Sequence, residues 1–396
     1  MGILKFLLKF LILVVFPLGE LFRFTLINSI NFSVLDIVVF LIVLSWVVFI
    51  RKKVKIEFFW PLIIFIMILI FSLLLNVSSL PILSFISAFL YIVRWVLYLL
   101  IIYVIFSMDK NFKEKILWYL SVSGLVIAII GYVQFFLFPS LQSLYYLGWD
   151  SHLYRLFSTF LDPNFCGLIL VLSLLLNFNH IKVFKKWGKL YVFYIIQFLI
   201  FIAILLTYSR TALIALIISI VSLLLLKRRW KLIVIFLLIV SFVIFFLPRT
   251  FKTEGTNFLR TNSIQSRLSS INDVLTIYKE QPIFGIGFNA LRFQQFKHGY
   301  INAANWEITH AGAGTDDSFL FVLVTTGVVG LTLYLFLWYS ILKSLVKKSI
   351  KKKNNLVFIT ISSCIAVIAG SFTINALFYP FIMLWLWIIL GVTESS

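Results

Sequence analysis

The chain has 396 residues, of which 62% are hydrophobic, 18% aromatic and only 12% charged. This composition excludes an ordinary soluble domain, in which about a quarter of the residues are charged. The formal net charge of +20 does not indicate nucleic-acid binding, because most of the 34 Lys and Arg residues lie in short connectors between apolar runs. Basic residues in such connectors orient membrane helices, so we expect a lipid bilayer as partner and no nucleic acid. Cys166 and Cys364 each lie inside an apolar run, so we expect neither a disulfide framework nor a thiolate metal site.

Apolar runs of the length that an α-helix needs to cross about 30 Å of hydrocarbon recur along the chain. The first run carries Lys5 and Lys9 like a signal peptide, but no small-residue cleavage site follows before Glu20, so we interpret it as a retained span. The sequence predicts an all-α integral membrane protein with about twelve transmembrane helices. These lie at residues 4–19, 34–50, 58–75, 82–107, 115–137, 162–179, 190–208, 211–226, 231–248, 316–342, 356–372 and 374–391.

The basic residues fall in alternate connectors of this twelve-span arrangement. By the positive-inside rule these connectors are cytoplasmic, and both termini are then cytoplasmic as well. Very short breaks at Ser209-Arg210 and near Phe372 leave ten or eleven spans as the alternative. We expect one polytopic membrane domain over residues 1–396.

Residues 249–315 form the one long polar interruption, which we expect to be a large extracytoplasmic loop and a partly helical cap. Between Ile264 and Tyr278 the apolar residues recur at three- and four-residue steps, which predicts an amphipathic helix on the membrane surface. Further along the loop, Gly285-x-Gly287 lacks the third glycine of a dinucleotide fingerprint and is interpreted as a tight turn.

Two arginines lie within or between apolar runs, where a guanidinium costs about 2.5 to 3.5 kcal/mol at a helix centre. Arg210 lies between two runs and is interpreted either as an anion site for phosphate or as an interfacial residue that extends to water. Arg94 lies near the middle of its span, and we expect no carboxylate partner in the neighbouring spans. A structural and a ligand-binding role remain open for Arg94.

Further polar residues lie at the ends of apolar runs. Asp162 and Asn164 flank a proline in the pattern of a helix start, and the preceding Arg155 is a candidate for an outward basic cluster with Arg210 and Arg267. His310, Asp316 and Asp317 lie where the chain re-enters an apolar run, and a carboxylate with a raised pKa there would serve as a general base. Their spacing is not that of a metal site, so we expect no metal.

Four short motifs follow one another over about residues 150–335. They are Arg155-x-x-Ser-Thr-Phe-x-Asp162-Pro163-Asn164, Thr207-x-Ser209-Arg210-Thr-Ala-Leu, Ser266-Arg267 leading to Pro282-Ile-Phe-Gly285-Ile-Gly287-Phe288, and Asp316-Asp317-Ser-Phe-Leu320 leading to Gly327-Val-Val-Gly330. In residue type, order and spacing this set resembles the O-antigen ligase and polymerase superfamily of bacterial membrane glycosyltransferases. The resemblance implies catalysis on polyprenyl-pyrophosphate-linked sugars at the outer side of the cytoplasmic membrane, with no nucleotide sugar, metal or other cofactor.

The resemblance also implies roles for individual residues. Arg210 and Arg267 correspond to the arginines that bind the pyrophosphate, with Arg155 and Arg292 as further candidates. Asp316 would orient or deprotonate the acceptor hydroxyl, with Asp317 or His310 as substitutes. Ligases typically carry a His-Asn pair where this chain has Asp316-Asp317.

This departure looks more like the Wzy-type branch, which polymerises oligosaccharide repeat units into exopolysaccharide, capsule or O-antigen. Three alternatives remain: an O-antigen ligase, a transporter or flippase of lipid-linked oligosaccharides, and a non-catalytic membrane scaffold. Transporters often show inverted repeats and broken helices near the middle of the membrane, and neither is visible in the sequence. By family analogy we expect a flippase and a chain-length regulator as partners, and a multi-pass location in the bacterial cytoplasmic membrane.

Overall fold

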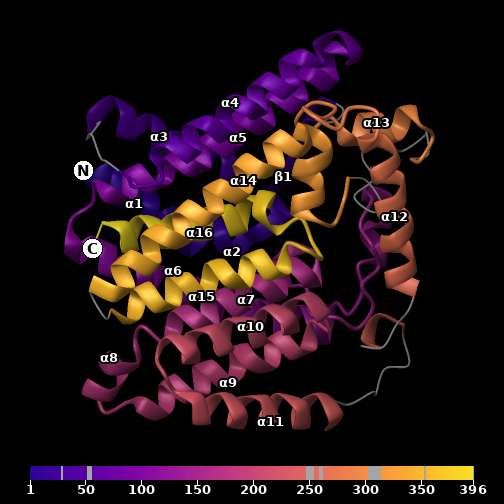
Figure 1. Cartoon of the computed structure of the whole chain (residues 1–396). Coiled ribbons are helices and arrows are strands. Elements are labelled where there is room, and N and C mark those ends of the chain that lie inside the picture. The colour runs from indigo at the N-terminus through magenta and orange to yellow at the C-terminus, as the bar shows by residue number, and fades with distance from the viewer. Residues whose placement is uncertain are drawn as a thin grey trace.

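The protein is a bundle of apolar helices, seen in a computed structural model that describes residues 1–27, 30–50, 56–246, 254–257, 262–301, 314–351 and 354–395 (Figure 1). Each of the twelve predicted spans contains an apolar helix. Among the described residues, four helical segments are long and apolar enough to cross a membrane, and eight further apolar helices have 10–17 residues. The prediction of an all-α multi-pass membrane protein is therefore confirmed in its coarse form.

The first long segment, Gly2–Phe22, is a succession of α1 (Gly2–Phe10), a π-helical turn (Leu11–Val15), α2 (Phe16–Leu18) and a 3-10 turn (Gly19–Phe22). A two-stranded antiparallel hairpin follows, with β1 at Arg23–Ile27 and β2 at Ile30–Ser33. The remaining helices are α3 (Val34–Phe49), α4 (Phe59–Leu75), α5 (Ile82–Phe106), α6 (Lys110–Leu137), α7 (Pro163–Asn177), α8 (Ile181–Lys186), α9 (Leu190–Leu206), α10 (Arg210–Leu226), α11 (Trp230–Phe246), α12 (Asn262–Tyr278), α13 (Leu291–Lys297), α14 (Ser318–Lys351), α15 (Asn355–Gly370) and α16 (Pro380–Glu394).

Helices α7 and α16 form the centre of the bundle. Every residue of α16 from Phe381 to Thr393 is buried, as is every residue of α7 from Cys166 to Asn177. A helix that is apolar on all sides is expected at the core, where other helices surround it. Small residues bring the helix axes close together: Gly167 on α7 faces Ala212 on α10, and Gly391 on α16 faces Ile105 on α5.

The prediction that no carboxylate pairs with Arg94 is wrong. Asp36, in the first turn of α3, accepts a hydrogen bond from Arg94 Nη2 at 2.9 Å and another from the Tyr98 hydroxyl at 2.9 Å. Arg94 Nη2 also donates to the Asn31 carbonyl of the hairpin at 2.6 Å. The side chains of Arg94 and Asp36 are only 14% and 10% exposed, so the pair compensates the cost of each buried charge. Arg94 thus holds the hairpin and α3 against α5.

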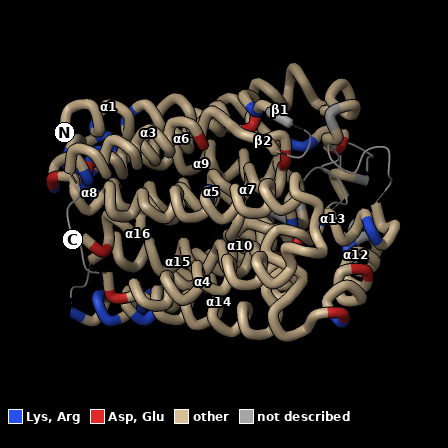
Figure 2. Tube along the Cα trace, turned by 90° about the horizontal axis from the view of Figure 1, so that it is seen from above, with Lys and Arg blue, Asp and Glu red and all other residues tan. Residues whose placement is uncertain are grey.

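The two ends of the bundle differ: one holds the termini and many basic residues, and the other is crossed by α12 (Figures 1 and 2). Both termini lie at one end, where many Lys and Arg residues also gather (Figures 1 and 2). At the opposite end α12 runs across the bundle, roughly perpendicular to its helices (Figure 1). The helix predicted between Ile264 and Tyr278 is confirmed, and its buried residues Val274 and Ile277 are three positions apart, as on one face of an amphipathic helix.

Candidate functional site

The first two sequence motifs are joined by hydrogen bonds at the beginnings of α7 and α10. Asn164 Oδ1 accepts from the Ser209 hydroxyl at 2.8 Å and from Arg155 Nη2 at 3.4 Å. Arg155 Nε donates to the Thr207 carbonyl at 3.0 Å, and the residue is only 6% exposed. Arg155 therefore binds two loops together, and Asp162 caps α7 as predicted, accepting from the amides of Asn164 and Phe165.

Arg210 is the first residue of α10, directly after the cap residue Ser209. The Ser209 hydroxyl accepts a hydrogen bond from the Ala212 amide at 3.2 Å, and the residue adopts the extended backbone of a helix cap. The first turn of an α-helix carries amides with no partner inside the helix and a partial positive charge. The guanidinium of Arg210 thus adds a full positive charge to an end of α10 that already favours anions.

The third and fourth motifs meet through their backbones at Gly327, where α14 is kinked. Gly327 has φ 70° and ψ −175°, and a Cβ there would overlap the Ile283 carbonyl. Gly285 has φ 72°, and a Cβ added there would overlap backbone atoms of both Thr325 and Thr326. Only glycine adopts such conformations at low cost and permits so close a backbone approach.

The kink leaves backbone groups of α14 available to the turn that follows α12. The Ile286 amide donates to the Val324 carbonyl at 3.1 Å, and the Val328 amide donates to the Pro282 carbonyl at 2.9 Å. Asn76, which directly follows α4, donates a hydrogen bond from Nδ2 to the Gly285 carbonyl at 3.0 Å. The motif glycines therefore fix the C-terminal end of α12 to the middle of α14.

Arg267 on α12 and Asp316 ahead of α14 form an ion pair. Arg267 Nε donates to Asp316 Oδ2 at 3.0 Å, and the two side chains are 29% and 62% exposed. Burial lowers the pKa of Arg210, and the positive charge of Arg267 lowers it further. Residues from α10, α12 and the start of α14, far apart in the sequence, thus form one charged cluster, which we call the arginine site (Arg210, Arg267 and Asp316).

The two aspartates of the fourth motif have different environments. Surrounding protein raises the pKa of Asp316 above its usual value, while the Arg267 guanidinium opposes that shift. Because 62% of the Asp316 side chain remains exposed, water limits the increase in its pKa. Asp317 instead caps α14: its Oδ1 accepts from the amides of Phe319 at 2.7 Å and Leu320 at 3.0 Å. Asp316 is thus the carboxylate that faces outward, and Asp317 is held by the helix.

The other predicted site residues lie elsewhere or outside the described residues. Arg292 is half-buried on α13, which packs against α12 and α14. His310 lies in residues 302–313, outside the described part of the chain. Within the described residues, no three His, Cys, Asp or Glu side chains are close enough together to hold a metal ion.

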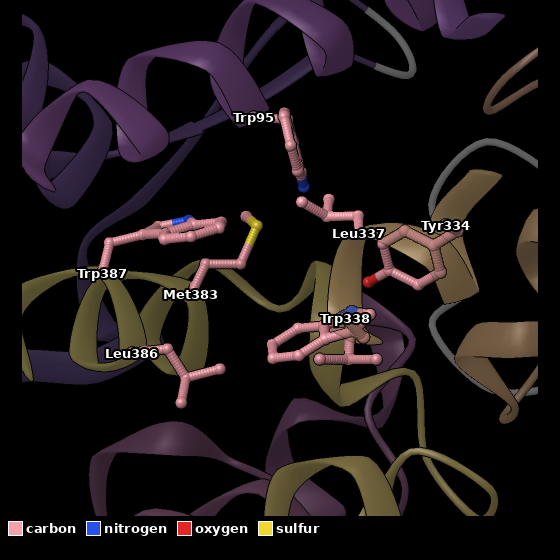
Figure 3. A pocket seen from close by; sticks show the side chains of 8 residues that line it. Trp95, Tyr334, Leu337, Trp338, Met383, Leu386 and Trp387 are labelled. Carbon is pink, nitrogen blue, oxygen red and sulfur yellow. The ribbon is translucent and has the colours of Figure 1, made fainter. Parts of the chain in front are cut away.

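A pocket inside the bundle does not coincide with the arginine site. Side chains from α5, α14 and α16 point toward one another around it, and none of those that line it is charged (Figure 3). The pocket is lined by Trp95, Tyr334, Leu337, Trp338, Leu377, Met383, Leu386 and Trp387. Aromatic rings that fill irregular space between helices account for it as a packing feature of the core.

The sequence carried no signal for one residue beside the site, Gln295 on α13. Its side chain is almost fully buried and forms two hydrogen bonds with the backbone of Gly314, two residues before Asp316. A glutamine in a polar loop belongs to no pattern that sequence reasoning uses. The bridging role of Asn164 was also missed, because a polar residue after Asp-Pro is ordinary at a helix start.

Fold and site together define a multi-pass helical membrane protein with arginines and a carboxylate clustered at one end of its bundle. Residues 195–335 match the family model of the O-antigen ligases, which confirms the resemblance to the O-antigen ligase and polymerase superfamily. The matched region contains all three residues of the arginine site, whereas Arg155 precedes it. None of the curated proteins compared with the chain matches it significantly. The match supports a membrane function of the O-antigen ligase or polymerase type.

Proposed function

We propose that this chain is a membrane glycosyltransferase that polymerises polyprenyl-pyrophosphate-linked oligosaccharide repeat units into exopolysaccharide, capsule or O-antigen. The observation that carries the proposal is the arginine site, in which Arg267 pairs with Asp316 and Arg210 begins α10. Arg matches phosphate oxygens with a bidentate fork, and an anion bound there would be stabilised by both guanidinium groups. The exposed amides of the first turn of α10 favour the same ligand.

In this mechanism the pyrophosphate is the leaving group, and its negative charge increases as the glycosidic bond to the donor sugar breaks. Fixed cationic donors stabilise such a developing charge, so Arg210 and Arg267 would supply what a metal ion supplies in other transferases. We propose that Asp316 orients the acceptor hydroxyl and takes its proton. Its carboxylate is exposed to the acceptor and lies beside Arg267, whereas Asp317 is committed to capping α14.

The polymerase assignment, as opposed to ligation, rests on the Asp316-Asp317 pair in place of His-Asn. We propose twelve membrane crossings with cytoplasmic termini, which place the arginine site on the outer side, under a cap that includes α12 and α13. Supporting this orientation, basic residues gather at the end of the bundle that holds both termini, and α12 lies across the other end (Figures 1 and 2).

Reconstitution tests the proposal. The purified chain in lipid vesicles receives a polyprenyl-pyrophosphate-linked repeat unit, without nucleotide and with a metal chelator, and the products are resolved on a gel. We expect a ladder with a spacing of one repeat unit. Replacing Arg267 or Arg210 by Ala removes one charge-assisted hydrogen-bond donor and should lower the rate by about 10- to 150-fold.

Arg229→Ala is the matched control, because Arg229 follows the other end of α10 and is exposed. This variant should form the ladder at the wild-type rate. Asp316→Asn should abolish polymer while the protein still inserts into the membrane, and a normal chain length in that variant would remove Asp316 from the mechanism. Substrate that moves across the bilayer without forming a ladder would identify a transporter. Transfer to a lipid A acceptor without polymerisation would identify a ligase.

A further inference from the structure

Gln295 on α13 forms an amide clamp on the segment that precedes α14. Its Nε2 donates to the Gly314 carbonyl at 2.9 Å, and the Gly314 amide donates to its Oε1 at 2.8 Å. The residue is only 2% exposed, so both polar ends of the side chain are removed from water and satisfied by one backbone unit. Burying an amide is unfavourable unless such bonds form, and a leucine would fill the same space without that requirement.

The clamp is one of two anchors around Asp316. On one side Gly314 is held by Gln295, and on the other side Asp317 caps α14 through the amides of Phe319 and Leu320. Asp316 lies between these anchors and extends toward Arg267. A short segment fixed at both ends has few backbone conformations, so the anchors determine where this exposed carboxylate points.

Helix α13 is itself attached to the helix that carries Arg267. The His298 ring, at the C-terminal end of α13, lies 2.7 Å from the Glu280 carboxylate, which follows α12. The residues between α12 and α13 are bonded to the kink of α14, where the Ile286 amide donates to the Val324 carbonyl. α13 therefore connects the two sides of the ion pair, and Gln295 is its contact with the Asp316 side.

We propose that Gln295 is a positioning residue that holds Asp316 against Arg267 through the backbone of Gly314. The effect of Gln295 on catalysis rests on the proposed function, but its role in fixing the position of Asp316 does not depend on any substrate. The clamp holds the Asp316 carboxylate where the acceptor hydroxyl would bind, and it keeps Arg267 paired with Asp316 until the pyrophosphate binds.

Hydrogen exchange and arginine modification test the geometric role without substrate. In Gln295→Ala the Gly314 amide loses its acceptor, and the loss of two buried hydrogen bonds should speed its exchange by about 30-fold. Phenylglyoxal should modify Arg267 up to about fivefold faster, because the partly exposed ion pair is no longer held in place. Gln294→Ala is the matched control. The neighbouring Gln294 is 5% exposed, and its Oε1 has no hydrogen-bond partner among the described residues.

Gln295→Glu provides a rescue. A protonated Glu has the shape of Gln and can donate to the Gly314 carbonyl, whereas an ionised Glu faces that carbonyl with a negative charge. Protection of Gly314 should therefore return when this variant is acidified. In the reconstituted assay Gln295→Ala should lower kcat by about 10- to 100-fold with little change in KM for the lipid-linked donor, as expected for a displaced acceptor base.

Wild-type exchange at Gly314 and wild-type modification of Arg267 in Gln295→Ala would overturn the proposal, as would equal effects in Gln294→Ala. Faster exchange with an unchanged kcat would also overturn it, because the clamp would then have no influence on Asp316 in the reaction. If the wild-type chain forms no polymer, the proposed function fails instead. In that case the phenylglyoxal result alone decides whether Gln295 holds the ion pair.

Discussion

Replacing Gly327 by Ala should detach α12 from α14. The backbone at Gly327 has φ 70° and ψ −175°, a region that is essentially restricted to glycine and costs other residues about 1 to 3 kcal/mol. The added Cβ would also overlap the Ile283 carbonyl, so the turn from Pro282 to Ile286 must move away. That movement breaks three backbone hydrogen bonds between the turn and α14, at 3.1, 2.9 and 3.3 Å.

At about 1 kcal/mol for each hydrogen bond, the backbone and hydrogen-bond contributions together amount to about 5 kcal/mol. This corresponds to a shift of roughly 10³- to 10⁴-fold in the equilibrium between the docked and the open turn. Hydrogen exchange of the purified protein measures the shift directly, because the Ile286 and Val328 amides are donors in two of these bonds. Val328→Ala is the control, since this neighbouring side chain is 48% exposed and its substitution leaves the backbone bonds in place. Unchanged exchange at Ile286 in Gly327→Ala, or an equal increase in the control, would refute the reasoning.

Three further predictions concern polar contacts that hold helices in place. Replacing Arg94 by Ala should leave Asp36 as an unpaired buried charge and lower the stability of the protein by about 3 to 5 kcal/mol, which a lower thermal midpoint in detergent would show. Replacing both residues by apolar ones of similar size should recover most of this stability, and an unstable double variant would contradict the prediction. The Gln294 carbonyl and Glu280 raise the pKa of His298 above 6.5, so the contact between α12 and α13 should contribute fully below about pH 6.5 and be lost as the pH rises through the raised pKa. Protection of the amides near Glu280, corrected for the intrinsic pH dependence of exchange, that stays constant over this range would disprove it. Asp162→Ala should cost about 1 kcal/mol through the lost cap of α7, and Asp162→Asn should cost less, as thermal unfolding can show.

Much of the candidate site could be predicted because its motifs are local. Asp162 was expected to cap a helix and does so, since a cap depends only on the next three residues. The resemblance assigns Arg210 and Arg267 to the same pyrophosphate, and the charge of Arg267 contributes to the lowered pKa of Arg210 after the larger effect of burial. The roles of Arg155 and Asp317 were less visible, because whether a charged side chain serves the backbone or faces outward depends on which atoms the fold brings to it.

Arg94 shows the limit of hydropathy. No carboxylate partner is expected for it in the neighbouring spans, but Asp36 lies in the first turn of α3 and pairs with it. The hairpin and the short α3 place that turn at the level of the middle of the longer α5, and the relative depth of two helices cannot be read from a linear sequence. Gln295 was missed for a similar reason, since its partner at Gly314 is defined only when α13 packs beside α14.

The sequence by itself determined which long apolar segments contain helices and that the chain belongs in a membrane, because both follow from the length and polarity of consecutive residues. It also predicted the tight turn at Gly285-x-Gly287, where both glycines have a positive φ. Only the tertiary structure decided that Gly285 and Gly327 face each other, that α7 and α16 form the core, and that Arg267 meets Asp316 across 49 positions of sequence. Nearly all of the helices are apolar, so hydropathy ranks them alike, and only the packing of side chains determines their neighbours.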